Sequence, residues 1–392
     1  MGYSATHGRY VALTIPSSLA SGATHTDFPV CFTTANLPSE MFDADGSYPA
    51  KSDGSDVRFS SDSPGDTPMN VEVERFGIDN NPANGFAEIW VRIPSFSHTV
   101  DTVVYCWWND PDASAVAADD VDEGSQGVWD SNFEGVWHLS EAVNNDADGY
   151  KDATANAAHM TGTSMSITAP TGAWAGSIGA EFDGSADRLD KASALVSAAP
   201  ATLSAWVKAR DAVSGNYNII CINDLGSTGD LMRLFVNRDS DKFTAQMYDG
   251  SGNSEAVGTT VLTSTPTWFH LAGAFSSSSA SEVFVNGDSE GTGSGSTSLD
   301  TMDNTCLGAL QWSGGPIQFY PGILDEARIS STARSAEWIT AEYAVINSIA
   351  SITAGTPGSP SGGITVVPTF GGRSARRLGA PTFGGRAVRR VA

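Results

Sequence analysis

Long hydrophobic runs are missing from this sequence. No stretch approaches the roughly 18 consecutive apolar residues that a membrane-spanning helix needs. The first residues, from Met1 to Arg9, also lack the apolar core of a secretory signal peptide. We therefore expect a protein that does not insert into a membrane and is not exported through a signal peptide.

Cysteine is rare, with four residues in a chain of 392. The four lie far apart and lack the C-x-x-C spacing typical of zinc sites. We interpret them as mostly buried free thiols, and a disulfide between Cys31 and Cys106 is the main alternative. The other two cysteines are Cys221 and Cys306.

Positive charge is scarce outside the C-terminal end. Residues 362–392 hold six arginines and no acid, which leaves 15 basic and 45 acidic residues, a charge of −30, for the rest of the chain. So acidic a body repels nucleic acid and anionic membranes, and its carboxylates can bind hard cations such as calcium. We therefore expect no nucleic-acid partner and no membrane partner.

A helical pattern is absent except over residues 335–347. Gly, Ser, Thr, Asp and aromatic residues prevail, and turn pairs such as Asp53-Gly54 and Asn84-Gly85 separate short segments. We predict an all-β protein of two β-sandwiches, followed by a short helix and a basic tail. The expected parts are a first sandwich over residues 1–110, an acidic linker over 111–126, a second sandwich with a closing helix over 127–355, and a Gly/Pro/Ser linker with a duplicated Arg-rich tail over 356–392.

The alternation of apolar and polar residues places the strands. In the first sandwich we predict strands over residues 9–15, 28–33, 57–60, 71–76, 87–93 and 103–108. In the second they include 135–139, 179–183, 202–208, 231–237, 242–248, 268–275, 282–286 and 322–329. Ser335 is expected to cap the helix, which would dock one apolar side against a sheet or the domain junction. That side carries Trp338, Ile339, Ala341, Val345 and Ile346.

The strand over residues 322–329 carries an acid in an apolar row. Strict alternation would place Ile323, Asp325, Ala327 and Ile329 on one face. A carboxylate in such a row needs a hydrogen-bonding, cationic or arginine partner. The sequence thus predicts that Asp325 meets a partner from elsewhere in the chain.

Catalytic motifs are also missing. The second sandwich has no Glu-x-Asp-x-Glu run of a glucanase, and no Gly-x-Ser-x-Gly or phosphate-binding loop occurs. Glu72 and Glu74 share one strand face and are interpreted as solvated acids, whereas His138 and His270 are assigned packing roles. We predict that the protein is not an enzyme.

Two sets of motifs stand out in the two sandwiches. The first set includes Phe28-Pro-Val30, Val71-Glu-Val-Glu74, Ala87 to Pro94 and Val104 to Asn109. It resembles a bacterial and phage domain of unknown function that commonly precedes laminin-G-like modules. The second set includes Gly135 to Glu141, Thr202 to Trp206, Leu324 to Ile329 and Ala333 to Ile339. It resembles the laminin-G-like, concanavalin A-like lectin/glucanase family. The resemblance implies that the second sandwich is a jelly roll.

The second resemblance also implies a structural calcium ion. The residues that match its acidic loop and closing strand are Asp146, Asp148, Asp152 and Asp325. The alternative is that Asp152 and Asn156 bond their own backbone in a turn and that backbone donors satisfy Asp325. For a glycan ligand, the candidate stacking side chains are Trp312, Tyr248, Tyr217 and Trp174, all expected in exposed loops.

The C-terminal tail repeats a 13-residue segment with one phenylalanine and three arginines per copy. We interpret it as an anchor to a protein partner, and a basic tail that binds nothing in particular is the alternative. The anchoring residues would be Phe370, Arg373, Arg376, Arg377, Phe383, Arg386, Arg389 and Arg390.

These features together predict a non-catalytic, surface-exposed binding protein. Domains of this kind usually act outside cells. A phage protein is made in the cytoplasm and reaches the outside when the host lyses, which is consistent with the missing signal peptide and the unpaired cysteines. We expect a phage virion protein (capsid decoration, tail or fibre) on the virion surface that binds a glycan or host-surface polysaccharide and contacts virion structural proteins through its tail. The alternatives are a secreted or cell-surface bacterial adhesin or lectin, and a glycan depolymerase. Homo-oligomerisation is left open.

Overall fold

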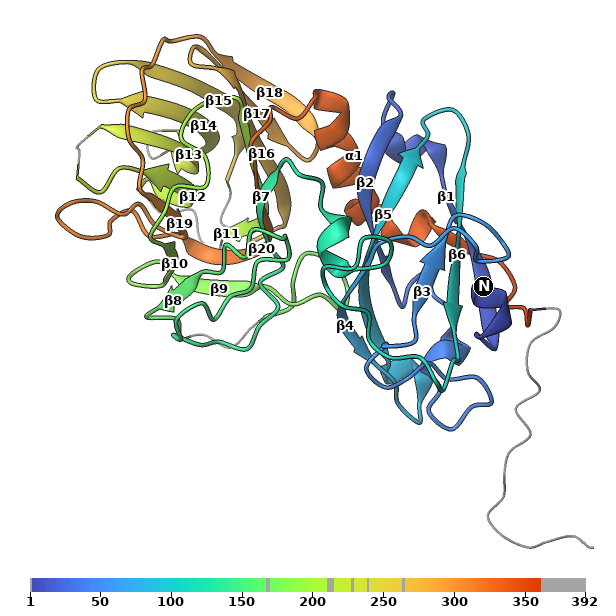
Figure 1. Cartoon of the computed structure of the whole chain (residues 1–392). Coiled ribbons are helices and arrows are strands. Elements are labelled where there is room, and N and C mark those ends of the chain that lie inside the picture. Colours follow the sequence, from blue (N-terminus) through green and yellow to red (C-terminus); the bar gives the residue numbers. More distant parts are fainter. Residues whose placement is uncertain are drawn as a thin grey trace, which may run out of the picture.

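The computed structural model describes residues 2–166, 170–209, 215–226, 229–237, 240–262 and 265–360 (Figure 1). The predicted basic tail and its anchoring residues from Phe370 to Arg390 lie outside the described residues, so that prediction stays open. Among the helices that the structure describes, none combines the length and the apolarity needed to cross a membrane.

The first sandwich stacks a four-stranded and a three-stranded antiparallel sheet. The larger sheet has the order β21-β1-β6-β3 and the smaller one β2-β5-β4. Their bounds are β1 Arg9–Ile15, β3 Arg58–Ser60, β6 Thr102–Trp108 and β21 Thr353–Ala354, and β2 His25–Thr33, β4 Val71–Gly77 and β5 Phe86–Phe96. All six strands predicted for this part are present, because apolar and polar side chains alternate along them.

The second sandwich consists of two larger antiparallel sheets. One has the order β15-β14-β13-β12-β19-β10-β8, and the other has the order β18-β17-β16-β11-β20-β7, with β9 also pairing with β20. The first sheet contains β8 Thr161–Thr163, β10 Arg188–Lys191, β12 Tyr217–Asn223, β13 Asp230–Asn237, β14 Lys242–Asp249, β15 Asn253–Val261 and β19 Asn304–Leu307. The second contains β7 Phe133–Trp137, β9 Ala180–Asp183, β11 Ala201–Ala209, β16 Phe269–Ser277, β17 Ala280–Val285, β18 Asp288–Gly293 and β20 Pro321–Ser330. The predicted all-β architecture of two sandwiches is confirmed.

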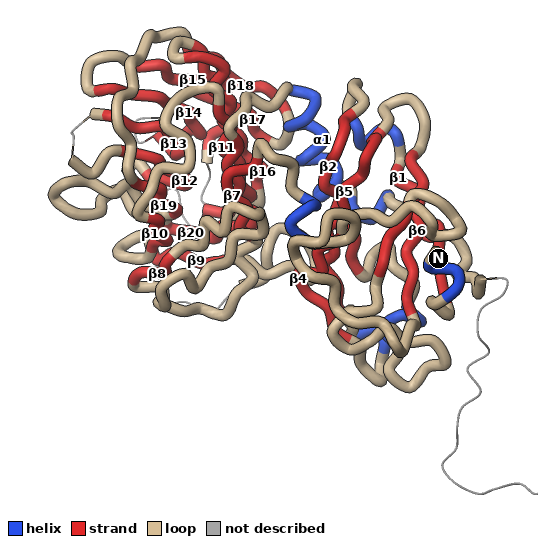
Figure 2. Tube along the Cα trace, in the orientation of Figure 1, coloured by secondary structure: helices blue, strands red, loops and turns tan. Residues whose placement is uncertain are grey.

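Helix α1 (Ala336–Asn347) lies at the junction of the two sandwiches, as Figure 2 shows. Oγ of Ser335 accepts a hydrogen bond from the backbone N–H of Trp338 and caps the helix, as predicted. Trp338 and Val345 belong to the same buried cluster as the core of the first sandwich, whereas Ile339 packs on Ala272 and Phe284 of the second. The predicted docking side is confirmed, and it contacts both halves.

The end of the described chain returns to the first sandwich. Thr353 and Ala354 pair with Thr14 and Leu13 of β1, and Gly358 exchanges two backbone hydrogen bonds with Tyr10. Thr353 and Ala354 fall within the range 127–355 that was predicted for the second sandwich, but they pair with a strand of the first. The physical reason is that an unpaired β1 would be an exposed sheet edge, which β21 covers.

Strand β20 departs from strict alternation at Glu326. This residue has a positive φ of 52°, and the pairing with β11 shifts register between Ser204 and Trp206. Because of this bulge, Leu324, Ala327 and Ile329 all face the inner core. The prediction that Asp325 shares a face with Ala327 and Ile329 is thus wrong.

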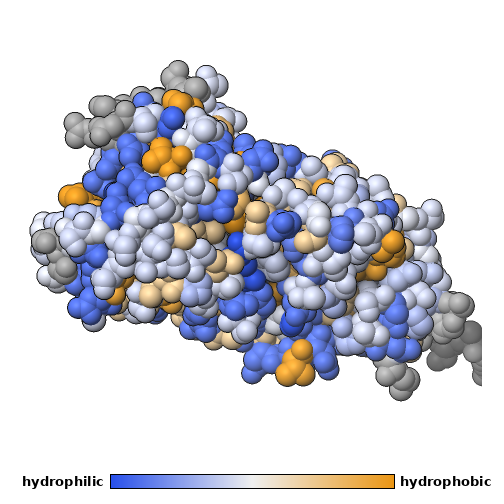
Figure 3. All heavy atoms as spheres, turned by 90° about the horizontal axis from the view of Figure 1, so that it is seen from above, coloured by the Kyte–Doolittle hydropathy of each residue, from blue (hydrophilic) through white to orange (hydrophobic). Residues whose placement is uncertain are grey.

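Exposed large hydrophobic side chains are scattered, and Figure 3 shows small hydrophobic groups separated by polar atoms on the face seen from above. All four cysteines are buried free thiols, as predicted. Cys221 and Cys306 lie opposite each other on β12 and β19.

Candidate functional site

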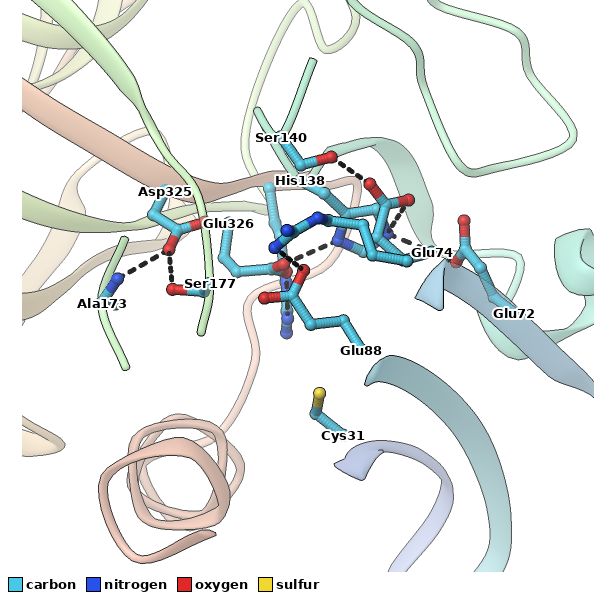
Figure 4. Close-up of polar contacts among 12 residues, drawn as sticks. Cys31, Glu72, Glu74, Glu88, His138, Ser140, Ala173, Ser177, Asp325 and Glu326 are labelled. Carbon is cyan, nitrogen blue, oxygen red and sulfur yellow. Dashed lines mark hydrogen bonds and ion pairs between the residues drawn. The ribbon is translucent and has the colours of Figure 1, made fainter. Parts of the chain in front are cut away.

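Charged side chains fill the space between the two sandwiches (Figure 4). We call this group the junction cluster. It combines carboxyl groups from β4, β5, β20 and α1 with histidines and an arginine, and most of its members are less than a tenth exposed. The cluster consists of Glu72, Glu74, Glu88, His138, His270, Asp325, Glu326, Arg328 and Glu342.

His138 is the centre of this cluster. It follows β7, and its Nδ1 lies 2.6 Å from Oε1 of Glu326. Its other nitrogen, Nε2, points across the junction to Oε2 of Glu72 at 3.4 Å and Oε2 of Glu74 at 4.0 Å. The predicted solvated face of Glu72 and Glu74 is therefore wrong. The second sandwich packs onto these acids, and their partners come from 57 or more residues further along the chain.

Arg328 provides the main positive charge of the junction cluster. Its guanidinium lies 2.9 Å from Oε2 of Glu326 and 3.0 Å from Oε1 of Glu342. It also sits 4.8 Å from the ring centre of Trp90 and 5.1 Å from that of Trp129. Arg328 thus links β20 to helix α1 and to the aromatic side chains of the junction.

Burial and neighbouring charges set the protonation of the acids in opposite directions. Burial raises the pKa of Glu88 to about 7, despite the nearby Arg75. For Glu342 burial acts in the same sense, but Arg328 outweighs it and the pKa falls to about 2. Burial likewise opposes charge on Glu326, but His138 and Arg328 hold its pKa below the usual value. The cluster therefore contains both acids held ionised and acids that favour the neutral form.

His138 and Glu72 respond to the same surroundings. Burial alone would lower the pKa of His138, but the carboxyl groups of Glu326, Glu74 and Glu72 outweigh it and raise the pKa well above the usual value. Burial raises the pKa of Glu72. Positive charge at this position is therefore strongly favoured.

Asp325 is hydrogen-bonded to a loop from elsewhere in the chain, as the sequence predicted. Its Oδ2 accepts hydrogen bonds from the backbone N–H of Ala173 at 2.8 Å and from Oγ of Ser177 at 3.2 Å. Gly172 makes this approach possible, because a Cβ there would collide with the carboxylate. Burial, followed by the neighbouring Glu326, raises the pKa of Asp325 well above the usual value. The partners are the donors of a loop, as in the alternative considered for this residue.

The four aspartates expected to bind calcium do not form a cation site in this structure. Oδ1 of Asp152 accepts from the N–H groups of Val136 and Thr154, and Oδ2 accepts from Thr154 Oγ1 and the N–H of Ala158. These four donors occupy its oxygens, as in a turn-stabilising aspartate. In the described part of the chain, the carboxylates and imidazole close enough to share a metal ion are those of Glu72, Glu74 and His138, a group without Asp146, Asp148, Asp152 and Asp325. The structure therefore does not bring the four predicted ligands together, and calcium binding stays untested.

A second polar arrangement lies on the outer face of the sheet that contains β12 to β15. Along β13 and β14, residues of the inner core alternate with residues of the outer face, among them Arg233 and Gln246, which are each 8% exposed. Nε of Arg233 donates to Oε1 of Gln246 at 2.8 Å, and Nη1 donates to Oε1 of Gln318 at 3.0 Å. Gln246 in turn donates to Asn253, which is exposed, at 3.0 Å. We call this row of amides and one guanidinium the outer polar row.

Aromatic side chains flank the outer polar row. Trp312 and Tyr248 are half-buried and pack on one small cluster formed by Cys221, Leu231 and Leu310. Tyr248 lies directly opposite Asn253 in the pairing of β14 and β15. The structure thus brings two of the predicted stacking residues together, beside the amides.

The other two predicted stacking residues lie elsewhere. Trp174 is only 9% exposed and belongs to the buried cluster of the first sandwich and junction, which corrects its expected exposure. Its loop folds inward because Ala173 and Ser177 bond to Asp325. Tyr217 packs on the inner core of the second sandwich. Neither residue joins Trp312.

Several of these residues were missed by the sequence analysis. Arg328 was given no functional role, although its position between Ala327 and Ile329 already places a charged residue in an apolar context. Arg233 gives the same signal, because it stands between Met232 and Leu234 in a buried strand. A charged residue inside a hydrophobic strand therefore indicated both the junction cluster and the outer polar row.

Comparison with known proteins identifies the second sandwich. Residues 183–340 match the family described as the concanavalin A-like lectin/glucanases superfamily. The predicted concanavalin A-like fold of this part is confirmed. The resemblance of the first sandwich to a domain of unknown function stays a prediction, and no curated protein matches the chain.

Solved structures share part of this shape. Domain 4 of AbnA, a GH43 extracellular arabinanase from Geobacillus stearothermophilus in complex with arabinotriose, is similar at 19% identity, with a TM-score of 0.40 over 54% of this chain and 98% of that one. The binding domain of Paraclostridial Mosquitocidal Protein 1 is similar at 11% identity, with a TM-score of 0.41 over 54% of this chain and 52% of that one. The CBM40 of a Ruminococcus gnavus IT-sialidase bound to alpha2,6 sialyllactose gives 12% identity and a TM-score of 0.33 over 38% of this chain and 84% of that one.

Proposed function

We propose that the protein is a non-catalytic glycan-binding protein and that its binding surface is the exposed end of the outer polar row, at Asn253, with Tyr248 and Trp312. The observation that carries the proposal is the placement of two half-buried aromatic side chains on the same outer face as the exposed amide of Asn253. Aromatic rings stack on the apolar faces of sugars, and amides bond to hydroxyl groups. The family match of residues 183–340, a superfamily of lectins and glucanases, supports the same class of ligand.

The position of the carboxyl groups supports binding over hydrolysis. A glycosidase needs a pair of carboxyl groups that flank the sugar bond. Glu72, Glu88 and Glu326 are each at most 9% exposed and are enclosed between the two sandwiches, where a polysaccharide chain has no room. Release of reducing sugar from any glycan by the purified chain would contradict this part of the proposal.

The binding surface is tested by Trp312→Ala on a glycan array. We expect the variant to lose at least about tenfold in affinity for the glycan that the wild type binds, because stacking and burial of one aromatic ring contribute roughly 1.5 kcal/mol or more. The matched control is Phe86→Ala, which removes an aromatic side chain of the first sandwich that is 40% exposed. The proposal fails if the wild type binds no glycan, or if the two variants bind alike.

We further propose the surface of a phage particle as the setting, with the duplicated tail as anchor. What supports this is the sequence: an acidic body joined to a tail with six arginines and no acid, which pairs readily with carboxylates of a partner protein. Deletion of residues 364–392 is expected to abolish incorporation into particles, measured by mass spectrometry of purified virions. Detection of the protein in a bacterial culture supernatant and not in virions would favour the adhesin alternative.

A further inference from the structure

Three side chains at the junction have the geometry of an incomplete metal site. Nε2 of His138 lies 3.4 Å from Oε2 of Glu72 and 4.0 Å from Oε2 of Glu74, and the three ligand atoms lie within 4.8 Å of one another. Ligands about 2.1 Å from a zinc ion at tetrahedral angles are roughly 3.4 Å apart. Small side-chain movements would therefore bring all three atoms to bonding distance of one ion.

The imidazole is oriented as a metal ligand. Nδ1 of His138 is bonded to Oε1 of Glu326, so Nδ1 keeps its proton and Nε2 is the nitrogen that a metal ion would bind, displacing any proton there. His138 is 6% exposed, and its Nε2 is buried without a hydrogen-bond partner. Nε2 lies within ion-pair distance of two carboxylates but is hydrogen-bonded to neither, and a cation bound between the three groups would satisfy all of them.

Each of the three residues is also oriented by an outer hydrogen bond. Nε1 of Trp129 donates to Oε2 of Glu72 at 2.7 Å. Oγ of Ser140 donates to Oε1 of Glu74, which leaves Oε2 of that carboxylate facing His138. Together with the bond from His138 to Glu326, these contacts give every ligand a fixed direction, as in protein metal sites.

The charges of the junction also favour a cation. Carboxyl groups outnumber guanidinium groups in the junction cluster, and Arg328 is already shared by Glu326 and Glu342. One imidazole with two carboxylates is a ligand set that suits zinc and manganese, whereas calcium prefers oxygen ligands alone. The side chain of Glu74 is 20% exposed, which places an entrance for the ion at this edge of the cluster.

We propose that Glu72, Glu74 and His138 bind one divalent transition metal ion, Zn²⁺ or Mn²⁺, across the junction of the two sandwiches. Two ligands come from β4 of the first sandwich and the third follows β7 of the second. The ion therefore joins the two sandwiches directly. An imidazolium at His138, paired with the same carboxylates, is the competing state.

Calorimetric titration of the chelator-treated full chain with Zn²⁺ tests the proposal, with Mn²⁺ binding followed by electron paramagnetic resonance. We expect one ion per chain and a higher melting midpoint in the presence of metal, because a ligand bound only by the folded state stabilises it. Glu74→Gln is the informative variant, because this partly exposed residue can be changed without leaving a buried charge unpaired. It should weaken binding at least about tenfold, while the spectrum of the folded chain is unchanged.

The matched control is Glu337→Gln, which removes an exposed carboxylate on α1 and should bind like the wild type. The proposal is overturned if the folded wild type binds neither Zn²⁺ nor Mn²⁺. It is also overturned if Glu74→Gln and Glu337→Gln bind equally well, or if only Ca²⁺ raises the melting midpoint. Loss of glycan binding leaves these readouts untouched, so the two proposals fail separately.

Discussion

Replacing Arg328 by alanine is expected to lower the free energy of unfolding by about 3–5 kcal/mol, because it removes the guanidinium that two buried carboxylates share. Glu326 and Glu342 are 4% and 6% exposed and both lie within 3.0 Å of the guanidinium. Neither acid has a route to solvent that would compensate for the loss. Urea denaturation followed by circular dichroism measures the effect.

The matched control for Arg328→Ala is Arg92→Ala. Arg92 pairs with Asp27 at 2.8 Å, but their side chains are 32% and 39% exposed, so its removal should cost at most about 1 kcal/mol. The double variant Arg328→Met with Glu342→Gln should recover part of the lost stability, because it removes one of the abandoned charges. Equal destabilisation by Arg328→Ala and Arg92→Ala would show that the junction charges do not contribute as described.

Replacing Trp338 by alanine is the second change with a large expected effect, again about 3–5 kcal/mol. The indole is 9% exposed, and its ring centre lies 4.6 Å from that of Phe28 on β2. The guanidinium of Arg334 stacks 4.2 Å from its ring. Truncation would therefore leave a cavity where helix α1 meets the first sandwich.

Thermal and urea unfolding of Trp338→Ala, followed by far-ultraviolet circular dichroism, measure this loss. Val121→Ala serves as the control, because Val121 is 85% exposed and its truncation should change stability by less than about 0.5 kcal/mol. Trp338→Phe should fall between the two, since it keeps most of the ring contact with Phe28. A Trp338→Ala chain as stable as Val121→Ala would contradict the packing role of the helix.

The strands could be predicted because their signal is local. Residues 9–15 alternate in hydrophobicity and form β1 with the predicted bounds. Ser335 caps the helix by accepting a hydrogen bond from Trp338, only three residues further along the chain. The bulge at Glu326 could not be predicted in this way. A positive φ at a glutamate has no sequence signature, and it depends on the pairing of β20 with three other strands.

The junction cluster could not be predicted from the sequence for a related reason. Glu72 and Glu74 look like the polar positions of any half-solvated strand until His138 is placed against them. Trp312 and Tyr248 were each predicted to contact a ligand, but their proximity depends on how the segment after β19 crosses the sheet. Local patterns predict which residues form strands, whereas contacts between distant segments decide which polar residues meet.

The return of the chain to β1 has a mechanical consequence. The described residues end at 360, two positions after the Gly358 that bonds to Tyr10. Tension applied through the following segment would first load these two hydrogen bonds, then the pairs of Thr353 and Ala354 with β1, and only later helix α1 and the second sandwich. The first sandwich would thus absorb a pull on the chain's end before the strain reached the second sandwich and its Trp312 loop.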